Sequence, residues 1–188
     1  MSLASTYHRL GADHVVNEVV LDEGTIRTRV AQLGVTISTD YAGRELLVVG
    51  ILKGALVFTC DLVRELQIPL HLDFMAISRY AAQGGTGKVR VLKDLEVDIP
   101  GKHVLLVEDI VDTGLTANYL CSLLSRRNPA SLALCTLLDR PELRLAELPL
   151  SYVGFQVSRE FLIGYGLDYQ DRYRDFPFIA SMNLTWPG

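Results

Sequence analysis

The sequence predicts an α/β fold with a central parallel β-sheet flanked by helices. Two observations carry this prediction. Short apolar runs, typical of buried strands, alternate with longer segments of helical periodicity. Such alternation is the pattern of β-α-β units, whose helices cover both faces of the sheet. The chain has 188 residues, 49% of them hydrophobic, which suffices for one substantial core.

In the first half of the chain, strand and helix patterns take turns. Residues 15–21 and 46–52 are rich in Val, Ile and Leu and predict strands. Between them, residues 25–33 have apolar side chains at helical spacing, and residues 55–66 repeat that spacing. Residues 70–77 return to an apolar run and predict a third strand, which completes a β-α-β unit.

The same order continues in the second half. Residues 103–107 (HVLLV) predict a strand, and residues 115–125 predict a helix that Asn128-Pro129 brings to an end. Residues 131–138 are again an apolar run. Two shorter strands are expected at 152–157 and 176–179.

The chain is expected to form a single domain, residues 1–188. Its core would run from about residue 40 to 140, and a small hood lobe would come from residues 10–40 and 141–188. One insert, residues 81–88 (AAQGGTGK), stands between two strand candidates. Its composition favours a solvated hairpin connection, and the alternative is a mobile loop beside a site.

Composition excludes several classes of partner. The formal net charge is −4 and the pI is near 5.5, so the chain lacks the basic surface that nucleic-acid binding requires. Charges interrupt every apolar run before it reaches the roughly 20 residues of a membrane span. Cys60, Cys121 and Cys135 lack metal-ligand spacing and are expected to be buried, reduced thiols, which fits the cytoplasm.

The most informative segment is VLLVEDIVDTGLT, residues 104–116, in which three carboxylates follow an apolar strand. Glu108, Asp109 and Asp112 would repel one another unless a cation or ribose hydroxyls lay among them. Magnesium meets that need, because it binds one or two carboxylates together with ligand phosphates and water. Capping of the following helix would account for one acid but not for three.

The end of the same segment predicts a phosphate site. A helix that begins at the carboxyl end of a parallel strand points unpaired N–H groups and a positive dipole end at a ligand. Gly114 allows close approach of the backbone, and the hydroxyls of Thr113 and Thr116 can donate to phosphate oxygens.

These residues resemble the signature of the type I phosphoribosyltransferases: an apolar strand, two acids, two apolar residues and then D-T-G-x-T. Within that family the chain is most similar to the bacterial hypoxanthine-guanine enzymes, from about residue 15 to 179. Supporting segments are GILKGALVF, DFMAIS, VRVLKDLEVDIPGKHVLLVEDIVDTGLT, CTLLDRP and FLIGYGLDYQDRYRD. The resemblance implies transfer of a 5-phosphoribosyl group from 5-phosphoribosyl 1-pyrophosphate to hypoxanthine or guanine, giving IMP or GMP.

The resemblance also implies roles for residues of the acidic segment. Glu108 and Asp109 would meet Mg²⁺ and the ribose hydroxyls, and Asp112 would accept a proton from the purine. The backbone from Asp112 through Leu115 to Thr116 would hold the 5-phosphate. The pair Lys53-Gly54 is similar to the family's pyrophosphate loop, although a Gly at a helix start needs no ligand.

Further roles are implied near the end of the chain. Asp168 would be a second Mg²⁺ and purine-side carboxylate, and Arg174 would bind pyrophosphate. From residue types alone, both could belong to a surface of ion pairs. Phe161 would stack on the purine and the backbone of Leu162 would read its edge; a core Phe in a strand is the alternative.

The chain departs from the family pattern at two positions. Arg140 stands where the family usually has a Lys that donates to the 6-oxo group, and an Arg fork is not equivalent to an ammonium. Arg79 takes a Ser position beside Tyr80, which is carried over as a substrate-side residue. Two alternatives stay open: transfer to xanthine, adenine, uracil or orotate, and a non-catalytic nucleotide-sensing regulator.

The resemblance implies a purine base and 5-phosphoribosyl 1-pyrophosphate as partners, with Mg²⁺ as cofactor. It also implies a homodimer or homotetramer without nucleic-acid or membrane partners. Because water could intercept the activated sugar, residues 80–88 are the candidate for a closing cover.

Overall fold

The computed structural model describes residues 16–80 and 88–182. Their contacts form two compact units. The larger unit is residues 29–158, and the smaller comprises the described parts of residues 1–28 and 159–188. The expected insert at 81–88 lies outside the described residues except for Lys88.

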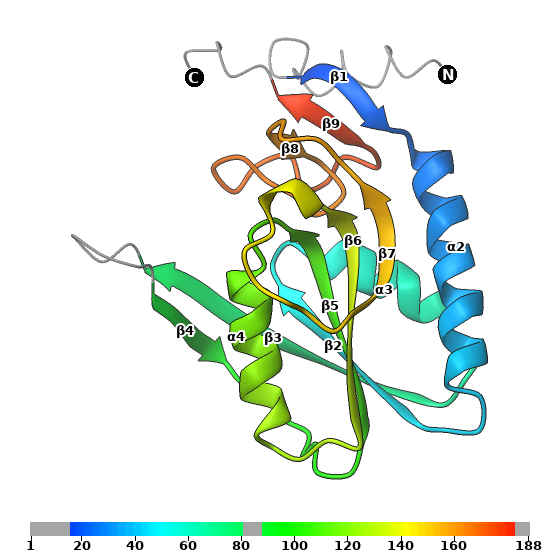
Figure 1. Cartoon of the computed structure of the whole chain (residues 1–188). Helices are drawn as coiled ribbons and strands as arrows, with labels where there is room; N and C mark the ends of the chain where they lie inside the picture. The colour runs from blue at the N-terminus through cyan, green and yellow to red at the C-terminus, as the bar shows by residue number, and fades with distance from the viewer. Residues whose placement is uncertain (1–15, 81–87, 183–188) are drawn as a thin grey trace. The chain divides into compact units, whose positions relative to one another are not determined.

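The larger unit is built on a six-stranded sheet with the strand order β4-β3-β2-β5-β6-β7 (Figure 1). Five strands are parallel, as expected, and β4 pairs antiparallel with β3 at one edge. The strands are β2 (Leu46–Leu52), β3 (Leu70–Tyr80), β4 (Lys88–Lys93), β5 (His103–Val111), β6 (Ser131–Asp139) and β7 (Leu150–Gln156).

Helices cover both faces of this sheet. Leu47, Val49 and Ile51 of β2 belong to one apolar cluster with α4 (Leu115–Ser125). The alternate residues of a strand point to the opposite face. On that face, a Cβ added to Gly50 would meet the Thr59 hydroxyl at 2.8 Å, which places α3 (Leu56–Glu65) there. Figure 1 shows α4 in front of the strands and α3 behind them.

The first helix, α2 (Glu23–Asp40), is longer than the predicted 25–33. Ile26, Val30, Leu33 and Ile37 are buried at helical spacing along its whole length. The prediction ended early because Gly34 is a common stop signal. Here Gly34 serves a close approach between helices instead, since a Cβ on it would lie 2.5 Å from Glu65 Cβ.

Two strand predictions needed correction, and two further strands lacked predicted bounds. β5 continues to Val111 and does not end at residue 107, so Glu108 and Asp109 lie within the strand. The strand expected at 176–179 is β9, Ile179–Met182, and residues 176–178 precede it. β4 is the strand candidate expected after the 81–88 insert, for which no bounds were predicted. The two-residue β8 (Leu162–Ile163) was not expected, because so short an edge strand carries little apolar pattern.

The smaller unit is a three-stranded antiparallel sheet with the order β1-β9-β8. β1 (Val16–Leu21) pairs with β9, which in turn pairs with β8. Its apolar cluster contains Ile163, Phe176, Phe178, Ala180 and Met182.

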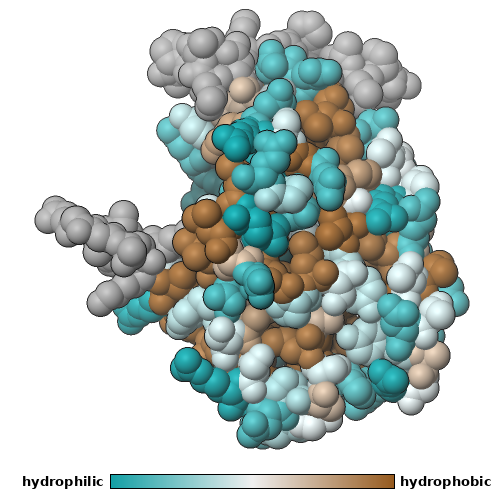
Figure 2. All heavy atoms as spheres, viewed as in Figure 1, coloured by the Kyte–Doolittle hydropathy of each residue, from teal (hydrophilic) through white to brown (hydrophobic). Residues whose placement is uncertain are grey.

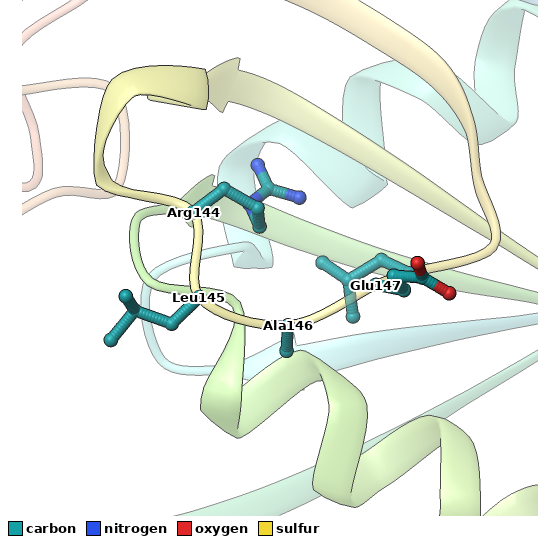
Figure 3. A pocket seen from close by; sticks show the side chains of 5 residues that line it. Arg144, Leu145, Ala146 and Glu147 are labelled. Atoms are coloured by element: carbon teal, nitrogen blue, oxygen red, sulfur yellow. The ribbon is translucent and has the colours of Figure 1, made fainter.

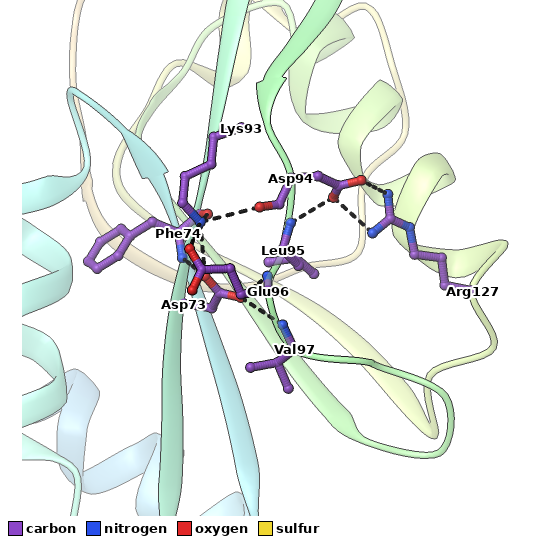
Figure 4. Close-up of polar contacts among 8 residues, drawn as sticks. All are labelled: Asp73, Phe74, Lys93, Asp94, Leu95, Glu96, Val97 and Arg127. Atoms are coloured by element: carbon purple, nitrogen blue, oxygen red, sulfur yellow. Dashed lines mark hydrogen bonds and ion pairs between the residues drawn. The ribbon is translucent and has the colours of Figure 1, made fainter.

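The link that follows β4 is fastened to β3 by a buried carboxylate (Figure 4). Asp73 is 7% exposed, and its Oδ2 accepts hydrogen bonds from the backbone N–H groups of Glu96 (2.7 Å) and Val97 (3.2 Å). Lys93 Nζ donates to the other oxygen at 3.3 Å. Burial opposes ionisation, but the backbone N–H of Phe74, which donates to Oδ1 at 2.7 Å, and these donors together outweigh it and hold the pKa of Asp73 below its usual range.

A second ion pair fixes the same link to the far end of α4. Arg127 donates from Nη1 and Nη2 to the two carboxylate oxygens of Asp94, at 2.8 and 2.7 Å. This two-pronged geometry is stronger than a single contact. The segment between β4 and β5 is therefore fixed both to β3 and to the end of α4.

Two of the three cysteines are buried, as expected. Cys121 and Cys135 lie in the core, whereas Cys60 is only half-buried, which corrects the expectation for that residue. All three are free thiols. Among the described helices, none has the length and apolar character needed to cross a membrane.

Candidate active site

The carboxyl ends of β2 and β5 meet at one edge of the sheet, and the two loops there touch. A Cβ added to Gly54, just after β2, would lie 1.7 Å from Asp109 Oδ2. No side chain fits between the Lys53-Gly54 loop and that carboxylate. Leu52 and Lys53 are joined by a cis peptide bond, and Lys53 is exposed. The structure thus brings together two parts of the predicted site that are separated by more than fifty residues.

The three carboxylates of the acidic segment have different surroundings. Successive residues of a strand face opposite sides, and Asp109 faces the Gly54 loop while Glu108 lines a cavity on the side of α4. Glu108 is 6% exposed and Asp109 half-buried. The third, Asp112, lies beyond the strand. The repulsion expected from the sequence is therefore relieved partly by geometry.

The cavity lies inside the turn of residues 112–116, which we name the DTGLT turn. Its volume is about 90 Å³. Gly114 has φ 78° and is the N-cap of α4, so the turn uses a left-handed residue to bring the helix amides around the cavity. The lining residues are Glu108, Ile110, Val111, Asp112, Thr113, Gly114, Thr116 and Ala117.

Asp112 is paired with the residue that departs from the family pattern. Arg140 donates from Nη1 to Asp112 Oδ1 at 3.0 Å, and from Nε to the Ser158 carbonyl oxygen at 2.8 Å. The arginine side chain is 11% exposed and that of Asp112 is 37% exposed. The guanidinium is thus held at two points, while the carboxylate keeps an open side.

The segment between β6 and β7, residues 140–148, runs beside the DTGLT turn, and we name it the strap. Arg144 Nη2 donates to the buried carboxylate of Asp139, and Leu145 N donates to the Thr113 carbonyl oxygen at 2.9 Å. Figure 3 shows Arg144 and Leu145 leaving the strap in opposite directions. An open hollow of about 530 Å³ is lined by residues 144–148.

Apolar side chains reach the surface on this face of the larger unit. Leu115, the first residue of α4, is 56% exposed, and Leu145 of the strap is 74% exposed. Figure 2 shows apolar atoms among polar ones on the face where α4 lies. The rim of the DTGLT turn is therefore partly apolar, although the turn itself is polar.

The predicted residues of the smaller unit form their own cluster. Arg174 Nη2 contacts Asp168 Oδ1 at 2.7 Å and Asp171 Oδ1 at 3.0 Å, and its Nη1 donates to the Gly166 carbonyl oxygen at 2.7 Å. Asp171 N donates to the other oxygen of Asp168 at 2.8 Å. Asp168 and Arg174, chosen for different ligands, are thus partners of each other within this unit.

The residues predicted to hold the base are also in the smaller unit. Phe161 is 40% exposed, and its ring meets that of Tyr169 edge to face with 5.8 Å between centroids. Its exposure disfavours the alternative of a core Phe. Leu162 is buried and starts β8. Tyr80 is the last residue of β3, directly before the undescribed residues 81–87.

Hard oxygen ligands are present for a magnesium ion. Asp109 is half-buried beside Gly54, and Glu108 opens on the cavity. In residues 16–80 and 88–182, no three Asp, Glu, His or Cys side chains gather as a ready metal site. The carboxylates of Glu108 and Asp109 fit magnesium, because this ion takes one or two carboxylates and completes its shell with substrate phosphates and water.

Comparison with known proteins places the chain in a family. The family model for the phosphoribosyl transferase domain matches residues 18–170. This chain belongs to the phosphoribosyltransferase family. The match covers the acidic segment, the Lys53-Gly54 loop and Asp168, and it stops before Arg174.

The relatives of this phosphoribosyltransferase include enzymes named for hypoxanthine or for hypoxanthine and guanine. It is 45% identical over 170 residues to the hypoxanthine phosphoribosyltransferase of Salmonella typhimurium, covering 89% of this chain and 96% of that protein. It is 43% identical over 175 residues to the hypoxanthine-guanine phosphoribosyltransferase of Mycobacterium bovis, covering 89% and 87%. A crystal structure of the Staphylococcus aureus hypoxanthine phosphoribosyltransferase superposes with a TM-score of 0.88 at 38% identity, covering 97% of both chains.

Some residues at this phosphoribosyltransferase's site escaped the sequence analysis. Arg144 donates to the Asp112 carbonyl oxygen, Asp139 accepts from Arg144, and the Ser158 carbonyl oxygen accepts from Arg140. The sequence assigned no role to any of the three. For Asp139 the available signals were its charge at the end of an apolar strand and its place in the segment CTLLDRP. Their roles depend on the path of the strap beside the DTGLT turn, and the strap has no periodic sequence pattern that would predict this path.

Proposed function

We propose that the chain is a purine salvage enzyme, a hypoxanthine (guanine) phosphoribosyltransferase. It transfers the 5-phosphoribosyl group of 5-phosphoribosyl 1-pyrophosphate to hypoxanthine or guanine, giving IMP or GMP and pyrophosphate. One observation carries the proposal above the others. The DTGLT turn and Glu108 line one cavity at the start of α4, and the neighbouring carboxylate of Asp109 faces the Gly54 loop. Relatives at 43% and 45% identity bear the same activity in their names.

In this proposal the DTGLT turn binds the 5-phosphate. Amides of the first helical turn donate to its oxygens, and the hydroxyls of Thr113 and Thr116 add to them. Glu108 and Asp109 hold the ribose hydroxyls and Mg²⁺. When bound, the ion supplies positive charge that stabilises the leaving pyrophosphate.

The remaining charges serve the leaving group and the base. Lys53 and Arg174 would contact pyrophosphate, which departs with the electron pair of the bond to the ribose carbon, and Asp168 would add a second carboxylate ligand. A purine nitrogen forms the new bond to that carbon, and its proton passes to Asp112. The open side of the Asp112 carboxylate is suited to that transfer, because a base must lie within hydrogen-bond reach of the proton.

Three residues that the family resemblance singles out would select the base. Arg140 would donate to the 6-oxo group, Phe161 would stack on the ring, and the backbone of Leu162 would read the edge. Because the Arg140 fork is already held by Asp112 and Ser158, it presents its remaining N–H groups in a fixed direction. A 6-amino purine offers a donor there and is rejected.

Variants at Arg140 test this assignment. Arg140→Met removes every donor, and we expect kcat/KM for hypoxanthine and guanine to fall about a hundredfold, as when a polar site loses a substrate partner. Arg140→Lys restores one donor and should recover most of that loss. Equal values for Arg140→Met and the wild type would remove Arg140 from base recognition.

The direct experiment supplies purified protein with Mg²⁺, 5-phosphoribosyl 1-pyrophosphate and one base at a time, and separates the nucleotides by chromatography. Product with hypoxanthine and guanine, and none with adenine, uracil or orotate, is the expected result. Product with only another base would keep the reaction and overturn the substrate. No product with any base would favour the nucleotide-sensing regulator.

The resemblance supports further proposals on organisation. Residues 1–188 would act as one domain with a core and a hood, in the cytoplasm, as a homodimer or homotetramer. Sedimentation of the purified protein tests the assembly, and a monomer at assay concentration would contradict it.

A further inference from the structure

The strap donates hydrogen bonds to three successive carbonyl oxygens, those of Val111, Asp112 and Thr113, where β5 leads into the DTGLT turn. Arg140 N donates to the Val111 oxygen at 3.0 Å, and Leu145 N donates to the Thr113 oxygen at 2.9 Å. Between them, the Asp112 oxygen accepts from Arg144 Nε at 3.3 Å. Two of these donors are backbone amides, and only the middle one is a side chain.

This arrangement determines where the amides of the turn point. A trans peptide is planar, so its N–H points away from its own C=O. When the oxygens of Asp112 and Thr113 face the strap, the N–H groups of Thr113 and Gly114 face the other side. A peptide that rotated would turn a negative oxygen toward a bound phosphate and remove a donor at the same time.

Arg144 is placed so that it controls the middle peptide. Its Nη2 is held by Asp139, a carboxylate that is 5% exposed at the end of β6. Its stem lies against the turn, because a Cβ added to Gly114 would come 2.9 Å from Arg144 Cδ. Figure 3 shows the side chain directed from the strap toward the strands. The guanidinium therefore connects a rigid strand end to the Asp112 carbonyl.

We propose that Arg144 is a positioning residue for the phosphate: it holds the Asp112–Thr113 peptide with its oxygen toward the strap and its N–H toward the ligand. The inference rests on the proposed function, which assigns phosphate binding to this turn. Arg144 touches no substrate in this account and acts only through the backbone of the turn.

The test compares a ligand with and without the phosphate. Binding of GMP and of guanosine is measured by calorimetry for the wild type and for three variants. Arg144→Lys keeps a charge for Asp139 but cannot also reach the Asp112 oxygen. The double variant Arg144→Gln with Asp139→Asn removes both charges and so avoids a buried unpaired carboxylate. Arg126→Gln, at an exposed position at the other end of α4, is the matched control.

We expect both Arg144 variants to weaken GMP binding about tenfold, which corresponds to about 1.4 kcal/mol. Guanosine has no phosphate to contact the turn, so its binding should change by less than about twofold. A tenfold change would correspond to the loss of a whole hydrogen bond. Arg126→Gln should leave both constants unchanged. This split separates positioning from a general loss of structure, which would weaken both ligands together and lower the melting temperature.

Two results would overturn the inference in different ways. If wild-type protein binds GMP more tightly than guanosine and the Arg144 variants keep that ratio, the positioning role is wrong while the phosphate site stands. If the wild type itself does not distinguish the two ligands, the assignment of the DTGLT turn fails, and the role of Arg144 fails with it.

Discussion

The Asp112 carboxylate and the Arg140 guanidinium form an ion pair with 3.0 Å between Oδ1 and Nη1. The group proposed to accept the proton is thereby linked to the group proposed to read the base. The arginine is also fixed to the Ser158 carbonyl oxygen, so the carboxylate has a firmly placed neighbour. Proton acceptance and base selection are therefore expected to be coupled at this site.

Asp112→Asn should lower kcat about a hundredfold, because the amide cannot accept the purine proton but keeps the shape of the side chain. The KM for 5-phosphoribosyl 1-pyrophosphate should change far less, since the phosphate is bound through the backbone. Steady-state kinetics measure both. Asp98→Asn, at an exposed position, is the control, and a kcat within threefold of wild type for Asp112→Asn would argue against the assigned proton acceptor.

Gly54→Ala should impair the site without unfolding the protein. The new methyl group would lie 1.7 Å from Asp109 Oδ2, so the carboxylate must move. A misplacement of about 1 Å can cost about a hundredfold in rate, and we expect a loss of that order in kcat/KM for 5-phosphoribosyl 1-pyrophosphate. In the control Gly24→Ala the nearest atom is 3.4 Å away. Equal kinetics for both variants would show that Asp109 has no fixed role.

Asp73→Asn should destabilise the protein in a pH-dependent way. The folded pKa of Asp73 lies below its usual value, so its stabilisation is present above about pH 4, the ordinary range of an aspartate, and is lost as pH falls through the folded pKa. Urea unfolding at pH 7 should show a loss of about 1–3 kcal/mol, from weakened hydrogen bonds to a buried carboxylate. The difference should narrow below pH 4, and a constant difference down to pH 3 would contradict the ionised state.

Cys60 should be the thiol that iodoacetamide modifies first in the folded protein. Burial, together with the charge of Glu108, raises the pKa of the Cys121 thiol to about 11, and burial raises the pKa of Cys135 as well. Only the thiolate reacts, so both core thiols should be protected at pH 8. Mass spectrometry after digestion should find one labelled cysteine, and three after unfolding in urea. Early labelling of Cys135 would mean that the core opens readily.

Local pattern was enough to predict most of the fold. β2 and α4 begin and end where the apolar runs and the Asn128-Pro129 stop predicted. α2 was cut short at Gly34, because a glycine that permits close packing of helices looks the same in sequence as one that ends a helix. β8 was missed, and the bounds of β4 were not predicted, because short strands at an edge contribute little to periodicity.

The candidate site was likewise predictable in part from the sequence. The sequence by itself determined that three acids, a glycine and two threonines lie at the end of a parallel strand and the start of a helix, because those are neighbours along the chain. The tertiary structure decided which side each acid faces, that Gly54 lies against Asp109, and that Arg144 holds the Asp112 carbonyl. Contacts of that kind join residues tens of positions apart, and they exist only once the sheet has set the register of its strands and the loops have packed against its edge.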